Sequence, residues 1–163
     1  MNDDFKSRLE SAIKRGQQRR DLSANAAKRK ELTEEELKRL HTSFRLTLSE
    51  RIETKIKSIV DAFPGFREES LFGEVGWGAA CYRDDLQIQE GRRSNQYSRF
   101  EMVIRPFSDL QVLDLKGKGT VKNRELFNRA LFRNIAEVDL EEFESVIDAW
   151  TIEYAEQYAA KSS

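Results

Sequence analysis

Residues 99–119 read RFEMVIRPFSDLQVLDLKGKG, and this stretch decides the fold class. Apolar residues alternate with charged ones on both sides of a turn at 106–109, which is typical of strands with one buried face. We therefore predict an antiparallel hairpin whose two loop residues are Ser108 and Asp109. The positions on its buried face are Phe100, Met102, Ile104, Leu113 and Leu115.

The flanking residues extend this hairpin into a meander. Upstream, residues 75–82 alternate in the same way, and the parity then changes to Leu86 and Ile88, which predicts a bulge near residues 83–84. We expect a hairpin loop at 91–95 and a turn at the glycines of 117–119, followed by a short fourth strand at 120–121. In this register Glu101 faces Lys116, and Asp85 faces Glu101.

Residues 33–63 predict one long helix. Thr33 and Glu36 form a capping box, apolar residues recur every three or four positions, and Pro64-Gly65 ends the pattern. At about 1.5 Å per residue the helix is roughly 45 Å long, so we expect part of its stripe to extend past a small sheet and to pair with a partner. The candidate interface residues are Leu37, Leu40, Phe44, Leu48 and Ile52.

Residues 140–158 predict a second amphipathic helix with an acidic outer face and Asp139 as its cap. Residues 125–135 fit no single element. The expected fold class is α+β: a long N-terminal helix, an antiparallel meander of three to four strands, and a C-terminal amphipathic helix packed on one sheet face.

The N-terminal residues differ in composition from the rest. Phe5, Leu9 and Ile13 indicate a short amphipathic helix, and residues 17–30 hold too little apolar surface to order on their own. We interpret 1–31 as a basic arm that is partly disordered or conditionally helical, and 32–163 as a single α+β domain.

Composition narrows the class of protein. The single cysteine excludes an intramolecular disulfide, no leader or membrane-spanning run is visible, and a net charge of -1 indicates no global electrostatic partner. We expect a cytoplasmic protein that needs no cofactor or metal and does not engage a membrane. The charges are nevertheless segregated: residues 12–30 carry seven bases against one acid, and residues 136–163 carry eight acids against one base.

Four residues could form a carboxylate–lysine cluster on the sheet: Asp85, Glu101, Asp114 and Lys116. In part this pattern resembles the PD-(D/E)xK nucleases, in which sheet carboxylates hold a divalent metal and a lysine two residues after an acid assists the chemistry. The resemblance covers three or four residues and lacks the Pro-Asp pair. The structural alternative is a solvated cross-strand pair between Glu101 and Lys116.

A second candidate site is basic. If the loops at 91–95 and 117–119 lie at the same end of the meander, a basic pole forms there, and the arm adds further cations for polyanion binding. The candidate polyanion-binding residues are Arg92, Arg93, Lys116, Lys118, Lys122 and Arg124 of the pole, and Arg19, Arg20, Lys28, Arg29 and Lys30 of the arm. The alternative is that the arm docks on the acidic C-terminal helix.

Cys81 and His41 are weaker candidates for a nucleophile and base. Cys81 lies in a strand of small apolar residues, where a cysteine is usually a packing residue. His41 lies on the long helix between the apolar positions.

These observations favour a non-enzymatic interaction or assembly module that self-associates or docks a protein partner through its long helix. The alternative is a sequence-nonspecific nucleic-acid or polyanion-binding protein. A metal-dependent nuclease-like enzyme is the second alternative.

Overall fold

The computed structural model describes residues 2–30 and 32–161, with side chains described for 4–22, 32–88 and 90–161. Two long helices, α1 (Asn2–Lys30) and α2 (Glu34–Ala62), precede five strands. The strands are β1 (Arg67–Leu71), β2 (Trp77–Gln89), β3 (Arg92–Ile104), β4 (Val112–Val121) and β5 (Arg124–Asn134). A 3-10 turn, η1 (Ile135–Glu137), leads into α3 (Leu140–Lys161).

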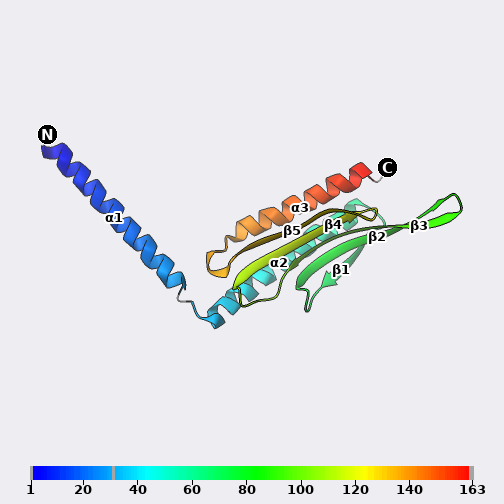
Figure 1. Cartoon of the computed structure of the whole chain (residues 1–163), viewed down its shortest axis with the longest axis horizontal. Coiled ribbons are helices and arrows are strands. Elements are labelled where there is room, and N and C mark those ends of the chain that lie inside the picture. Colours follow the sequence, from blue (N-terminus) through cyan, green and yellow to red (C-terminus); the bar gives the residue numbers. More distant parts are fainter. Residues whose placement is uncertain (1, 31, 162–163) are drawn as a thin grey trace.

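The five strands form one antiparallel sheet in the order β1-β2-β3-β4-β5. The fold is therefore α+β, as the sequence predicts. The expected three or four strands were too few, because residues 67–71 and 124–134 also pair as strands. In Figure 1 the β2–β3 hairpin extends beyond the rest of the sheet, and α1 extends away from the sheet and from the other two helices.

Local signals in the sequence place the helix ends. The Thr33 hydroxyl accepts a hydrogen bond from the Glu36 amide at 3.2 Å, which caps α2 as predicted. The Asp139 carboxylate accepts from the Glu141 amide at 3.1 Å at the start of α3. Gly65 has a φ of 106°, a conformation that favours glycine, and the chain reverses there into β1.

The register differs from the predicted one. Glu101 pairs with Lys118 and Val103 with Lys116, a shift of two residues that keeps each side chain on its expected face. The β2–β3 pairing runs without interruption from Trp77 to Gln89, so the predicted bulge is wrong. Leu86 and Ile88 are exposed as a result.

The core lies on the sheet face that carries Phe100. The five predicted buried positions of β3 and β4 are fully buried. The Tyr154 ring of α3 stacks on Phe100 with a centroid distance of 4.8 Å, and its hydroxyl donates to the Thr120 carbonyl at 2.9 Å. The α2 residues Leu48, Ile52 and Ile56 belong to the same apolar cluster.

Gly117 and Gly119 lie within β4 and do not form the predicted turn, which occurs instead at Lys122-Asn123. The physical reason is packing against α3. A β-carbon on Gly117 would lie 2.5 Å from Cε3 of Trp150, and one on Gly119 would lie 3.0 Å from Tyr154. The glycines therefore let large aromatic rings approach the strand.

We predict that Gly117→Ala destabilises the protein by about 1–3 kcal/mol, because the added methyl group overlaps the Trp150 ring. Lys118→Ala, at the adjacent exposed position, should change stability by about 0.5 kcal/mol or less. Urea unfolding followed by circular dichroism measures both. Equal stability of the two variants would contradict the tight packing of α3 on β4.

Candidate functional site: a basic groove on the outer sheet face

A groove of about 290 Å³ lies on the outer sheet face, the face opposite the core. We call it the outer-face groove. It is formed by the end of β1, the loop before β2, and strands β3, β4 and β5. Its lining residues are Leu71, Val75, Arg99, Glu101, Val103, Arg105, Lys116, Gly117, Lys118 and Asn128.

Small residues make the sheet hollow at this place. One row across the outer face runs from Leu71 through Gly78 and Val103 to Lys116, in register. Gly78 leaves a gap between two apolar side chains, and a β-carbon there would lie 2.0 Å from the Met102 carbonyl oxygen. The strands lie so close together here that only glycine fits, and the missing side chain deepens the groove.

The charge of the lining is strongly positive, with four cations and one acid. Arg99 donates to Glu69 at 3.1 Å and to Glu101 at 3.3 Å. Burial alone would lower its pKa, but hydrogen bonds to Tyr97 and Glu69 raise the pKa above its ordinary value and keep the guanidinium charged. Arg99 and Glu101 thus neutralise each other at one side of the groove.

The remaining cations are less fully engaged. Lys118 lies 3.8 Å from Glu125, and Arg105 donates from one terminal nitrogen to the Val75 carbonyl at 2.8 Å. In the part of the chain that the structure describes, Lys116 takes part in no ion pair or hydrogen bond that satisfies its ammonium group. The groove therefore offers Lys116 and part of Arg105 to an incoming anion.

The predicted carboxylate–lysine cluster is divided between the two sheet faces. Glu101, Asp114 and Lys116 share the outer-face parity. Asp85 pairs in register with Gln96 and lies on the helix side, where it accepts from Arg83 at 2.8 Å beside Phe63 and Tyr158. Among the described residues no group of three or more His, Cys, Asp or Glu side chains is arranged to hold a metal ion.

The basic pole is also divided. Arg92 and Arg93 lie at the tip of the protruding β2–β3 hairpin, whereas Lys122 lies in the β4–β5 turn and Arg124 begins β5. Asn123 fixes that turn lower on β3 through hydrogen bonds with Tyr97 and with the Asn95 carbonyl. On the arm, Arg19 and Arg20 are exposed, and the side chains of residues 28–30 lie outside the described set.

The five candidate interface residues of α2 lie in the chain's own core. Leu37, Leu48 and Ile52 are buried, and Leu40 and Phe44 pack against the same cluster. The predicted overhang of the stripe is therefore absent along α2. The Arg45 guanidinium lies over the Trp77 ring at 4.0 Å from the ring centroid, so the sheet also contacts α2 at this position.

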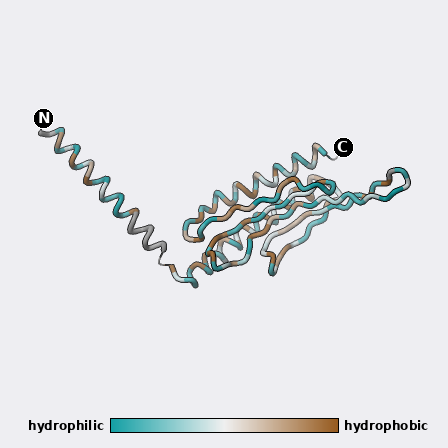
Figure 2. The backbone as a smooth tube through the Cα atoms, viewed as in Figure 1, coloured by the Kyte–Doolittle hydropathy of each residue, from teal (hydrophilic) through white to brown (hydrophobic). Residues whose placement is uncertain are grey.

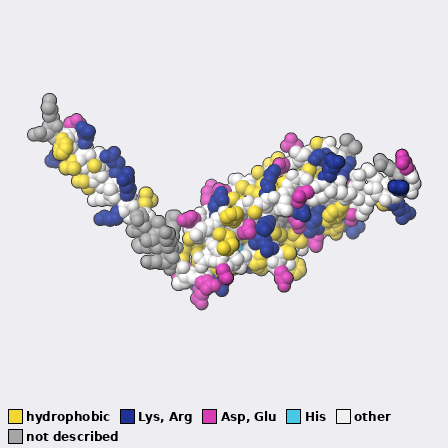
Figure 3. Space-filling view, viewed as in Figure 1, with side chains coloured by type: hydrophobic (Ala, Val, Ile, Leu, Met, Phe, Trp, Pro, Cys, Tyr) yellow, Lys and Arg dark blue, Asp and Glu magenta, His cyan; other side chains and the backbone are white. Residues whose placement is uncertain are grey.

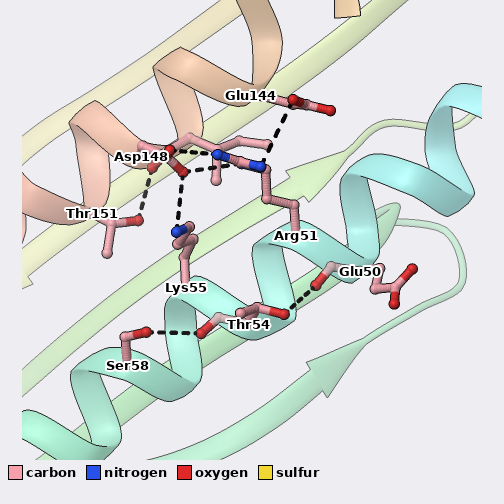
Figure 4. A network of polar contacts seen from close by, with 9 residues as sticks. Glu50, Arg51, Thr54, Lys55, Ser58, Glu144, Asp148 and Thr151 are labelled. Atoms are coloured by element: carbon pink, nitrogen blue, oxygen red, sulfur yellow. Dashed lines mark hydrogen bonds and ion pairs between the residues drawn. The ribbon is translucent and has the colours of Figure 1, made fainter. Parts of the chain in front are cut away.

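Four of the six acids of α3 form ion pairs within the domain. Figure 4 shows Asp148 between Arg51 and Lys55 of α2, with Glu144 also reaching Arg51. The hydrogen bond from Arg51 lowers the pKa of Asp148. Glu153 pairs with Arg129, and Glu142 with Arg133 at 2.9 Å. These ion pairs engage four of the acids on which the basic arm could have docked.

α1 carries the most exposed apolar stripe of the described chain. Phe5, Leu9 and Ile13 are 69%, 48% and 52% exposed. Figure 2 shows apolar positions recurring along the α1 tube, and Figure 3 shows hydrophobic side chains gathered near its N-terminal end beside basic ones. The sequence predicted this stripe but not a helix that continues through Gly16 to Lys30.

Cys81 and His41 do not form a catalytic pair. Cys81 is fully buried in β2, and burial raises the pKa of its thiol to about 12. His41 lies on α2, where its Nε2 is 3.1 Å from the Arg105 carbonyl oxygen and its ring meets Phe107 edge-on. Burial, the largest effect, lowers the pKa of His41.

Two residues of the outer-face groove, Arg99 and Arg105, were absent from the candidate sites, although their alternation with buried residues placed them on this face. Val75 appeared only as the first position of the alternating pattern at 75–82, and Leu71 lies in the short strand β1, which the sequence did not predict. No helix among the described residues has the length and apolar character needed to cross a bilayer. Comparison with known proteins gives no significant match to a family model, a curated protein or a solved structure.

We predict that Cys81 does not react with a thiol reagent such as Ellman's reagent in the folded protein. At pH 8 only about one thiol in 10⁴ with a pKa near 12 is ionised, and the sulfur is buried. Unfolding in guanidinium should release one reactive thiol per chain. Ser43→Cys, at an exposed position, provides the control and should add one fast-reacting thiol; native Cys81 that reacts at the same rate would contradict its burial.

Proposed function

We propose that this chain is a non-enzymatic interaction and assembly module that pairs with a second copy of itself. The element that pairs is α1, in place of the α2 stripe that the sequence suggested. The observation that carries the proposal is the exposure of Phe5, Leu9 and Ile13 on a helix that leaves the domain. A lone polar helix is marginal in water, so α1 gains stability when this stripe is covered.

The stripe is symmetric about Leu9. At 3.6 residues per turn, Phe5 and Ile13 lie about 40° to either side of it, a row with the i, i+4 spacing of helix-packing ridges. In an antiparallel pair Leu9 meets Leu9 of the second copy, and Phe5 meets Ile13. Gly16 and Ala12 adjoin the row, and their small size allows the two backbones to approach closely.

Charges on the flanks favour the antiparallel orientation. On one flank Lys6 lies near Glu10 of the second copy. A parallel pair would instead bring Lys6 near Arg8 of the second copy, which places like charges together. Near the twofold axis the two Arg8 side chains approach each other, which limits affinity.

The expected affinity is modest. Full burial of an apolar side chain contributes roughly 1.5–3 kcal/mol, and three such side chains per copy must offset the entropy lost on association. We therefore expect a dissociation constant in roughly the micromolar range.

Leu9→Glu should weaken self-association by at least about tenfold, because it places like charges on the twofold axis. Leu22→Glu is the matched control: Leu22 is 69% exposed and lies about 140° from Leu9 on the same helix, so the dimer should persist. Size-exclusion chromatography with light scattering, over about 1–200 µM protein, measures both. A wild-type chain that stays at the monomer mass of 19.0 kDa throughout would contradict the proposal.

Cysteine crosslinking tests the orientation in a Cys81→Ser background. Leu9→Cys should form a disulfide with the same position of the second copy. Phe5→Cys should not, because an antiparallel pair separates the two Phe5 positions by about 12 Å along the helix axis. Mixing Phe5→Cys with Ile13→Cys should restore crosslinking. Efficient self-crosslinking of Phe5→Cys would indicate a parallel pair and contradict the antiparallel arrangement.

Sequence-nonspecific polyanion binding by α1 is the second candidate function. It is favoured because four of the six acids of α3 are already paired with Arg51, Lys55, Arg129 and Arg133, which leaves fewer acids of that helix for the cations of α1. Arg15, Arg19 and Arg20 are exposed on the described part of the helix.

Binding to a single-stranded oligonucleotide, followed by fluorescence anisotropy, should weaken steeply as salt rises. Removing two phosphate contacts in Arg19→Ala/Arg20→Ala should lower the slope of log K against log salt by about 1.4. Arg39→Ala/Lys57→Ala removes the same charge from exposed positions of α2 and should leave the slope unchanged. Absence of binding at low salt, or equal slopes for both variants, would exclude this function.

A further inference from the structure

The outer-face groove combines an apolar floor with a positive rim, and self-association through α1 makes no use of it. The floor is formed by Leu71, Val75 and Val103, and it is lowered at Gly78, which places no side chain between Leu71 and Val103. The volume of about 290 Å³ lies at the lower end of the range for small-molecule sites. The groove therefore has room for a compact ligand rather than a nucleic-acid strand.

The rim has capacity for one negative charge. Arg99 already holds Glu69 and Glu101, and Lys118 lies beside Glu125, so these two cations are largely balanced. Lys116 and the part of Arg105 that does not bind the Val75 carbonyl remain, with Asp114 opposite Arg105 on the same face as the acid beside them. These three side chains together carry one net positive formal charge. A lysine and an arginine with free donors suit a carboxylate, which accepts hydrogen bonds from both.

The backbone places the two cations at adjacent positions of the outer face, next to Val103. Lys116 pairs in register with Val103, and the Arg105 amide donates to the Asp114 carbonyl at 2.8 Å, one step further along the same two strands. Both side chains share the outer-face parity with Val103. An anion between them lies beside Val103, with Asp114 as the neighbouring acid on the same face.

We propose that the outer-face groove binds a small monocarboxylate with an apolar body. The carboxylate contacts Lys116 and Arg105, and the apolar body covers Val103 and lies between Leu71 and Val75. Asn128, at the β5 side, provides an amide for a polar substituent. The ligand is a single small molecule and not an extended acidic chain. The surface next to the groove carries Glu69 and Glu125, which would repel further negative charges.

The test is an NMR titration of the full-length 15N-labelled protein with 3-phenylpropionate, up to about 10 mM. We expect shift changes confined to the amides of β3 and β4 around Val103 and Lys116, together with those near Val75. The neutral analogue 3-phenylpropionamide should bind at least about tenfold more weakly, because it lacks the charge that Lys116 recognises.

Two variants report the role of Lys116 without loss of the fold, since this side chain is exposed. Lys116→Glu should abolish the shift changes, and Lys116→Gln should weaken binding by about three- to tenfold. Lys57→Glu, an equal change of charge at an exposed position on α2, should leave the titration unchanged. The wild-type spectrum serves as the reference for correct folding of each variant.

Several results would overturn the proposal. These are no shift changes at the highest concentration, shift changes outside the groove, equal binding of the amide, and unchanged binding to Lys116→Glu. Inorganic phosphate producing the same changes at the same concentration would show that the apolar floor is not used, and would contradict the proposed ligand class. None of these outcomes bears on self-association through α1.

Discussion

The fold depends on the close contact between α3 and strand β4. Two glycines remove the side chains that would otherwise hold the helix away, so Trp150 and Tyr154 lie directly on the strand. Tyr154 then stacks on Phe100 of the neighbouring strand and donates its hydroxyl proton to the Thr120 carbonyl. The Tyr154 ring thereby fills the centre of the core, and its buried hydroxyl has a hydrogen-bond partner.

The same contact has a consequence for α2. With α3 held against the sheet, Arg51 and Lys55 of α2 face Asp148, and these ion pairs join the two helices at one place (Figure 4). The apolar stripe of α2 is thereby covered by its own chain. Two surfaces that this packing leaves uncovered are the stripe of α1 and the outer-face groove.

Much of the architecture could be predicted from the sequence. The long helix with its Thr33 cap, the buried face of β3 and β4, and the C-terminal helix all follow local periodicity, which the structure confirms. Strand β5 could not be predicted, because the spacing of Phe127, Leu131 and Ile135 fits a helix until pairing with β4 is known. The predicted turn at Gly117 and Gly119 was wrong for a related reason. Glycines indicate a turn in local sequence, and their place within a strand is explained only by the packing of Trp150 and Tyr154 of α3 against them.

The sites were harder to predict than the elements. The β3–β4 register differs from the predicted one by two residues, which places Lys118, not Lys116, opposite Glu101. The β2–β3 register differs by an odd number of residues, which moves Asp85 to the helix side of the sheet. Parity survives an even shift but not an odd one, so the outer-face position of Lys116 was predictable and the position of Asp85 was not. The α2 stripe is buried because the sheet has five strands and is wide enough to cover it. Local sequence patterns do not give the number of strands that pair.

The central claim is that α1 is the pairing element and that α2 belongs to the core. Hydrogen–deuterium exchange of the full chain at two protein concentrations, about 1 µM and about 200 µM, tests it most directly. Amides of residues 4–16 should become more protected at the higher concentration, while the amides of α2 exchange slowly and equally at both. Protection of α1 that is the same at both concentrations, or α2 amides whose protection rises with concentration, would contradict the account.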